Sequence, residues 1–213
     1  MKPKKLLSLD ISTHTGWSLF EEPNELVTYG AYDTPIKEYK AEIRTFRDYP
    51  ASYPSNFVNA SLMQANAVAA LLDEHKPDLV VIEEVNKARQ RFSQKALEWA
   101  HFTVVQLLIS RNQPFRYLTT SCWRKVVKCY LNEWPEYRRY NGKVSRAKKN
   151  SLPTRSGAIV AKIDGKIVSS INQKKLSVLL VNQHFGLDFA LSEDDVCDSI
   201  NMGRAAIELG LLK

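Results

Sequence analysis

Residues 4–17 read KKLLSLDISTHTGW. A short apolar run from Leu6 to Ile11 carries an acid, Asp10, and a polar turn follows before strand-like composition resumes at Trp17. This pattern predicts a meander of strands. An unpaired carboxylate is costly to bury in an apolar core, so an acid that closes such a strand indicates a functional group.

A second apolar run, from Asp78 to Glu83, has no polar alternation and also ends on an acid. Continuous apolar runs are typical of parallel strands that are covered on both faces. Apolar residues at helical spacing predict helices on either side of it, and a further helix capped by Thr120 or Ser121. Strands that alternate with helices predict an α/β fold, with a mixed central sheet in a single domain over residues 1–213. The predicted helices cover residues 56–75, 93–110 and 173–184, and another strand covers 114–118.

Three acids begin the last predicted helix, for which Ser192 is the predicted N-cap in a capping-box-like pattern with Asp195. Asp195 and Asp198 are three residues apart, and Asp194 and Asp198 are four apart, so either pair shares one helical face. Acids on one face repel each other unless they share a cation, and oxygen ligands suit Mg²⁺ or Mn²⁺. The alternative is that these acids only stabilise the helix dipole.

Positive charge is concentrated in one segment. Residues 138–175 contain eleven Lys and Arg against one acid, a net charge of +10, whereas the whole chain carries +7 and the remainder therefore −3. Strand-like sequences on either side of Asp164-Gly165 predict a β-hairpin within this segment. We interpret residues 138–172 as a basic insertion that contacts a nucleic-acid backbone, with a solvated surface loop as the alternative.

The cysteines and the hydropathy limit the class of protein. Three cysteines without metal-ligand spacing indicate reduced thiols and no disulfide framework. No apolar stretch approaches the roughly 18 residues of a membrane span, and the N-terminus meets Asp10 where a signal peptide would still be apolar. We therefore expect a cytoplasmic protein without a membrane segment.

Three motifs together resemble the RuvC family of Holliday-junction resolvases, in particular its divergent phage members. Residues 7–17 are similar to the family's opening strand and turn, Val81-Ile82-Glu83-Glu84-Val85 to its second motif, and Asp195-Val196-Cys197-Asp198-Ser199-Ile200 to its closing helix. The similarity spans residues 4–127 and 173–206. It implies a ribonuclease H-like fold and a crossover junction endodeoxyribonuclease that acts as a homodimer on branched DNA.

The resemblance also implies a set of site residues. Asp10, Glu83, Asp195 and Asp198 would bind two Mg²⁺ ions, with Glu84 and Asp194 left as alternatives, and paired sites would place symmetric nicks in a four-way junction. Lys175 would contact phosphate near the site, and Phe92 would replace the aromatic residue that relatives place after the glutamate. The helix over 93–110 is either the dimer element or an ordinary core helix. The remaining predicted DNA contacts are Arg138, Arg139, Lys143, Arg146, Lys148, Lys149, Arg155, Lys162, Lys166 and Lys174.

Two other readings remain open. The loop from Asp10 to Gly16 also resembles the phosphate loop of the actin, sugar kinase and chaperone ATPase superfamily, but 213 residues with eight glycines lack the second domain and glycine-rich loops of that group. The second is a branched-DNA-binding protein without catalysis.

Overall fold

The computed structural model describes residues 4–33, 55–85, 91–134, 159–163 and 166–212. Within them, a five-stranded sheet has the order β3-β2-β1-β4-β5. The meander pairs antiparallel, and β4 and β5 run parallel to β1. This is the mixed sheet with an antiparallel meander that the sequence predicted. The strands are β1 (Lys5–Asp10), β2 (His14–Glu21), β3 (Glu25–Asp33), β4 (Leu79–Glu83) and β5 (Phe115–Leu118).

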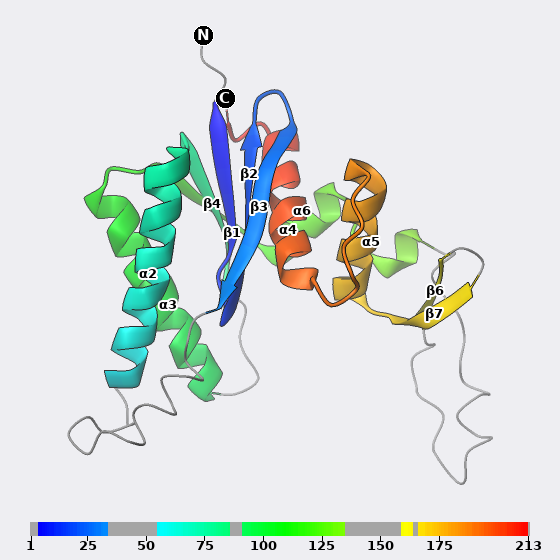
Figure 1. Ribbon diagram of the computed structural model, residues 1–213, viewed down its shortest axis with the longest axis horizontal. Helices are drawn as coiled ribbons and strands as arrows, with labels where there is room; N and C mark the ends of the chain where they lie inside the picture. The colour runs from blue at the N-terminus through cyan, green and yellow to red at the C-terminus, as the bar shows by residue number, and fades with distance from the viewer. Residues whose placement is uncertain (1–3, 34–54, 86–90, 135–158, 164–165, 213) are drawn as a thin grey trace.

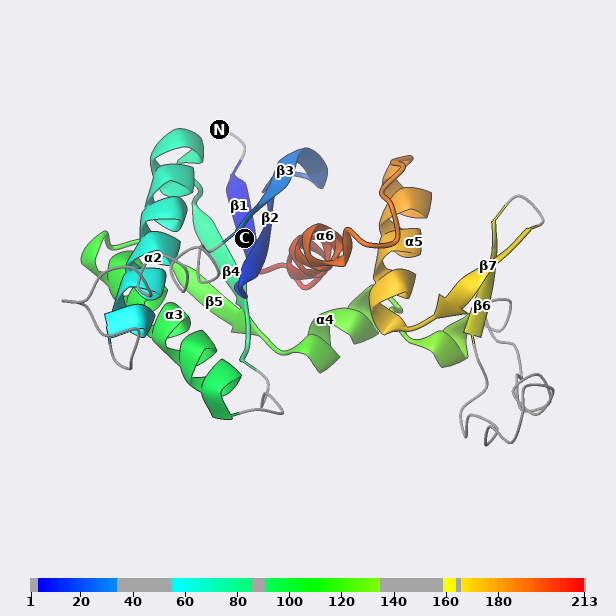
Figure 2. The ribbon, with the colours of Figure 1, turned by 60° about the horizontal axis from the view of Figure 1, so that its bottom comes forward.

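Helices cover both faces of this sheet (Figure 1). Helices α2 (Ser55–His75) and α3 (Arg91–Ser110) lie together on one face. Helix α6 (Asp194–Glu208) lies on the other face, and Figure 2 shows it end-on between the sheet and α5 (Gln173–Phe185). The short helix α4 (Thr120–Val126) follows β5 and is followed by the 3₁₀ turn η1 (Leu131–Glu133).

Alternation along β1 decides which way Asp10 faces. Leu7 and Leu9 are buried with residues of α2 and α3, whereas Leu6 is buried with residues of α6. Ser8 lies on the side of Leu6, because a Cβ atom on Gly203 of α6 would be 3.2 Å from the Ser8 Cβ atom. Successive side chains of a strand point to opposite faces, so Asp10 shares the face of Leu6 and Ser8. The strand therefore directs Asp10 toward α6.

A second pair of strands lies beyond α5 (Figure 1). β6 (Ile159–Ile163) and β7 (Lys166–Ile171) pair antiparallel, with Ile163 opposite Lys166. The predicted turn at 164–165 and the most basic stretch, within 135–158, lie outside the described residues. That residues 138–172 form a DNA-binding insertion stays a prediction.

Two predicted helix caps are wrong. Glu193, and not Ser192, is the N-cap of α6 and makes no side-chain capping bond. The chain turns just before the helix, where the Glu193 amide donates to the Ala190 carbonyl and Glu193 Oε2 accepts from the Ala190 amide, so Ser192 lies in the turn. In α4 the cap is Thr119, whose hydroxyl accepts from the Cys122 amide; the sequence prediction was one or two residues late.

The sequence predicted neither a disulfide framework nor a membrane segment, and the described part of the chain bears on both. Cys122, Cys129 and Cys197 are all free thiols. Among the described helices, none is long and apolar enough to cross a membrane.

Candidate active site

The predicted strand-end acids lie side by side at one edge of the sheet. The last residues paired in parallel between β1 and β4 are Leu9 and Ile82, so Asp10 and Glu83 come next on neighbouring strands. Both face the layer of α6, since Leu79 and Val81, which have the parity of Glu83, are buried with residues of that helix. The fold therefore brings two distant acids to the start of α6.

Asp10 is at the centre of the acidic cluster, which we define as Asp10, Glu83, Asp195 and Asp198. Burial raises the pKa of Asp10 well above its usual value. The negative charges of Glu83 and Asp198, a hydrogen bond with Glu83 and the charge of Asp195 raise this pKa further. Each of the other three predicted acids is thus close enough to Asp10 to raise its pKa.

The sequence left Glu84 and Asp194 open as alternatives to Glu83 and Asp195, and the two sets differ in their effect on the pKa of Asp10. Glu83 and Asp195 are among the groups that raise the pKa of Asp10 most, and Glu84 and Asp194 are not. Glu84 instead raises the pKa of Tyr117, after the larger effect of burial. The geometry favours Glu83 and Asp195 as members of the cluster.

Asp198 is the most enclosed of the helix acids, with 4% of its surface exposed. Burial raises its pKa from 3.8 to about 7, although the Ser177 hydroxyl and the Arg124 guanidinium oppose the shift. Arg124 approaches Asp198 Oδ2 at 3.5 Å, and desolvation outweighs this long ion pair. Asp198 Oδ1 is buried and has no hydrogen-bond partner among the described residues.

Glu83 is held by two donors from α4. Glu83 Oε1 accepts hydrogen bonds from Thr120 Oγ1 at 2.6 Å and from Trp123 Nε1 at 2.9 Å. Trp123 is fully buried, so its indole can hold the carboxylate in one orientation. Sequence reasoning missed both partners, because a tryptophan at helical spacing looks like any core residue.

Helix α5 supplies a cation to the acids of α6. Lys174 Nζ donates to Asp195 Oδ1 at 3.1 Å and also contacts Asp194 Oδ2. Burial opposes protonation of this amine, but the hydrogen bonds to Asp194 and Asp195 raise its pKa above the usual value. The resemblance had indicated Lys175, whose amide is capped by Asn172 Oδ1 at 2.9 Å. Lys174 is the lysine seen on the acids, and a phosphate contact by Lys175 stays a prediction.

A buried histidine that the sequence did not indicate lies beside the strand ends. His101 of α3 is 6% exposed, bonds to the backbone of Ile11 and stacks on Tyr117 with ring centroids 6.0 Å apart. Burial lowers its pKa to about 4, while the bond to Ile11 and the charge of Glu83 oppose the shift. The imidazole is therefore neutral at neutral pH and supports the backbone that follows Asp10.

The cluster has the chemistry of a hard-cation site, with its side chains turned to protein donors. In the described part of the chain, no group of three or more His, Cys, Asp or Glu side chains is arranged to hold a metal ion as it stands. Glu83, Asp195 and Asp198 each face a donor of the protein, which for Asp198 is Arg124 on the Oδ2 atom. The other oxygen of Asp198, Oδ1, has no partner among the described residues. Oxygen ligands, mutual repulsion and an unpaired buried oxygen fit a divalent cation, provided that these side chains rotate toward it.

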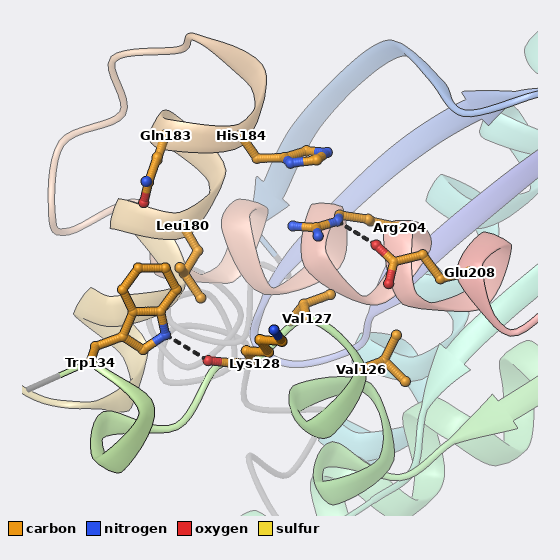
Figure 3. A pocket seen from close by; sticks show the side chains of 9 residues that line it. All are labelled: Val126, Val127, Lys128, Trp134, Leu180, Gln183, His184, Arg204 and Glu208. Carbon is orange, nitrogen blue, oxygen red and sulfur yellow. Dashed lines mark hydrogen bonds and ion pairs between the residues drawn. The ribbon is translucent and has the colours of Figure 1, made fainter.

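A hollow of about 580 Å³ adjoins the cluster and is lined mainly by polar side chains. Thr120 and Arg124 belong both to its wall and to the contacts of Glu83 and Asp198. A second hollow, of about 450 Å³, lies between α4, α5 and α6 (Figure 3). There the wall groups bind one another, Trp134 Nε1 to the Lys128 carbonyl and Arg204 to Glu208, and no cluster residue takes part. None of the four acids lines either hollow, but the first shares two wall residues, Thr120 and Arg124, with the contacts of the cluster.

Few of the predicted DNA contacts fall within the described residues. Phe92 is in the first turn of α3, Lys162 is on β6 and Lys166 is on β7. Lys174, also predicted to contact DNA, is in α5 with its amine on Asp194 and Asp195. The others in the basic segment lie outside the described residues: Arg138, Arg139, Lys143, Arg146, Lys148, Lys149 and Arg155.

Comparison with solved structures shows which known fold this chain shares. The chain is similar to Thermus thermophilus RuvC, with a TM-score of 0.57, 13% identity and coverage of 97% of this chain and 96% of that one. For the same protein in complex with a Holliday junction substrate, the TM-score is 0.56 at 13% identity, covering 98% and 96%. The yeast mitochondrial Holliday junction resolvase Ydc2 gives 0.50 at 14% identity, covering 99% and 80%. No protein-family model and no curated protein matches the sequence. The chain has a RuvC-like fold, as the resemblance of its motifs predicted.

Proposed function

We propose that this chain is a divalent-metal-dependent endonuclease that cuts branched DNA, with the four-way junction as its substrate. The observation that carries the proposal is the convergence of Asp10, Glu83, Asp195 and Asp198 at one edge of a RuvC-like sheet. Resolvases acting on Holliday junctions share this fold, which supports the choice of substrate.

The acidic cluster would hold two Mg²⁺ ions, for which Mn²⁺ can substitute. When bound, such ions activate a water molecule and stabilise the leaving oxygen of an in-line phosphodiester displacement. Asp10 would be the ligand shared by both ions, a role supported by the effect of the three other acids on its pKa. Trp123 and Thr120 both donate to Glu83 Oε1 and would help to orient this ligand.

The protein's own cations would orient the substrate. Lys174 lies on the acids of α6, and Arg124 lies between Asp198 and the adjoining hollow, so both can meet a phosphate group near the reacting one. The basic segment of residues 138–172 would follow the DNA backbone farther away, and Phe92 would stack at the junction.

A homodimer would supply the second active site that paired, symmetric nicks require. Phe102 and Ile109 on α3 are 61% and 62% exposed, and their spacing of seven residues places them on one helical face. Val104 and Leu108 on the same helix are fully buried, so α3 has both a core face and an exposed apolar stripe. We assign the dimer contact to that stripe.

The test is cleavage of a four-way junction in Mg²⁺ by the wild-type protein and by Asp10→Asn. Paired nicks from the wild type and none from the variant are expected, while Asp188→Asn, which changes an exposed acid outside the cluster, should cleave normally. Binding without cleavage by the wild type would leave a DNA-binding protein, and ATP hydrolysis without DNA would favour a kinase-like one. Faster cleavage of forks, flaps or RNA hybrids would change the assigned substrate.

A further inference from the structure

Each acid of α6 in the cluster is faced by a cation from a neighbouring helix. Lys174 of α5 is 3.1 Å from Asp195 Oδ1, and Arg124 of α4 is 3.5 Å from Asp198 Oδ2. Asp198 is buried, and a buried carboxylate without a counter-charge strongly destabilises a fold. These two cations therefore compensate part of the charge that a bound metal ion would otherwise compensate.

The guanidinium of Arg124 has contacts on several sides, but not all of its hydrogen-bond donors have a partner among the described residues. Its guanidinium reaches Gln173 Oε1 at 3.3 Å and lies 4.9 Å from the centroid of the Trp123 ring. Arg124 Nε and Asp198 Oδ1 are both buried without a hydrogen-bond partner among the described residues, although the two side chains form an ion pair. Buried polar groups are normally bonded, so this pair keeps one unused donor on Arg124 and one unused acceptor on Asp198.

We propose that Arg124 and Lys174 are resident counter-ions of the acidic cluster, which metal binding displaces and thereby frees to bind phosphate groups of the DNA, Arg124 doing so in the adjoining hollow. The proposal rests on the metal site proposed above. Arg124 already forms part of the wall of that hollow of about 580 Å³, so it needs no movement of the backbone to face a phosphate there. A guanidinium can bind two phosphate oxygens at once, and a lysine can bind one as a point charge.

This arrangement couples the two ligands. While no metal is bound, the acids compete with DNA for Arg124 and Lys174. A divalent cation on the same acids removes that competition, so the metal and the phosphate backbone each strengthen the binding of the other. The metal-free protein would therefore bind weakly to the DNA phosphate groups that lie next to Arg124 and Lys174.

The first measurement is thermal unfolding of Arg124→Gln without DNA, in EDTA and in saturating Mg²⁺. In EDTA the variant leaves Asp198 without its cation, and Tm should fall by about 6 °C or more. In Mg²⁺ the metal ion replaces the missing charge, so the variant should lie within about 2 °C of the wild type. Its dissociation constant for Mg²⁺, measured by calorimetry, should be on the order of tenfold lower than that of the wild type.

Arg204→Gln is the matched control, because Arg204 also pairs with an acid, Glu208, and its side chain is 18% exposed compared with 16% for Arg124. Its Tm deficit should be the same in EDTA and in Mg²⁺. Arg124→Lys keeps the charge and should retain most of the stability in EDTA. An equal deficit of Arg124→Gln under both conditions, with unchanged Mg²⁺ affinity, would show a merely structural arginine and overturn the proposal.

The second measurement is junction binding in EDTA and in Ca²⁺, followed by fluorescence anisotropy. The wild type should bind several-fold more tightly in Ca²⁺, and Arg124→Gln should lose most of this gain. An equal gain in both proteins contradicts the release of Arg124 to phosphate. A wild type that shows neither heat nor a Tm shift with Mg²⁺ contradicts the metal site itself, which separates failure of the proposed function from failure of this inference.

Discussion

Gly16 on β2 lies directly against the backbone of Asp195 at the start of α6. A Cβ atom on Gly16 would be 2.1 Å from the Asp195 carbonyl oxygen and 2.7 Å from the Val196 nitrogen, far inside contact distance. Gly16 is also the residue paired with Asp10 across the antiparallel strands. The absence of a side chain at this one position therefore sets how closely the acidic helix approaches the strand that carries Asp10.

Gly16→Ala should push α6 away from the sheet. We expect the free energy of unfolding to fall by about 1–3 kcal/mol, measured by denaturant titration, because the new methyl group meets backbone and cannot be accommodated by a side-chain rotation. Cleavage per folded molecule should fall as well, since Asp195 and Asp198 move with the helix. Gly186→Ala is the control: Gly186 has a φ of 67° and open space around it, so the variant should lose some stability but keep its cleavage rate. Normal cleavage by folded Gly16→Ala would contradict this account.

Trp123→Phe should remove the indole donor from Glu83 while keeping an aromatic ring in the core. Loss of a bond that orients a metal ligand typically lowers metal affinity or activity by about 10–100-fold. A Mg²⁺ titration of the cleavage rate measures this effect. Trp134→Phe also removes an indole bond, to the Lys128 carbonyl, but lies in the hollow away from the acids, so its Mg²⁺ dependence should match that of the wild type. Equal effects of the two substitutions would mean that Trp123 contributes packing alone.

Asp198 and Asp10 should each make the metal-free protein less stable as the pH rises from about 4 to about 7, whereas His101, whose pKa burial lowers to about 4, contributes in the opposite direction over the lower part of this range. Burial raises the pKa of Asp198 to about 7 and that of Asp10 well above its usual value, so at these two groups the folded state holds more protons than the unfolded state in this range. Their contribution to the free energy of unfolding then decreases with pH. Denaturant titrations in EDTA should show a shallower decrease for Asp198→Asn, which cannot ionise. The same slope in both proteins would mean that Asp198 does not contribute.

Phe102→Asp should produce a monomer if the exposed stripe of α3 forms the dimer contact. The wild type should sediment at twice its 24.3 kDa, and the variant at the monomer mass, because a carboxylate in an apolar contact is left unsolvated. Leu209→Asp changes another exposed apolar residue, 44% exposed at the end of α6, and should leave the dimer intact. A wild type that is monomeric at every concentration contradicts the assignment.

Neutralising Arg138, Arg139, Lys148 and Lys149 together should weaken DNA binding and flatten its dependence on salt. Each lost phosphate contact should make the slope of log K against log[salt] shallower by roughly 0.9. Anisotropy titrations at several salt concentrations measure the slope. An unchanged slope would show that the basic segment does not contact the DNA.

The sequence by itself determined the elements and the acids. Apolar runs ending at Asp10 and Glu83 predicted the strand ends correctly, because burial of a parallel strand on both faces leaves a clear local pattern. The helices over 56–75 and 93–110 followed from their spacing in the same way. The caps at Ser192 and Thr120 were wrong, since a turn of a few residues depends on contacts that a spacing rule does not contain.

Only the tertiary structure decided how those residues act together. The way α4, α5 and α6 lie against the sheet decides which glutamate, Glu83 or Glu84, faces Asp10. It also decides which lysine of α5 reaches Asp195, and it places Trp123 and Arg124 on the cluster. Such contacts join residues far apart in the chain, and no local pattern specifies them. The sequence supplied the charges of this site, and the close approach of α6 across Gly16 brought them together.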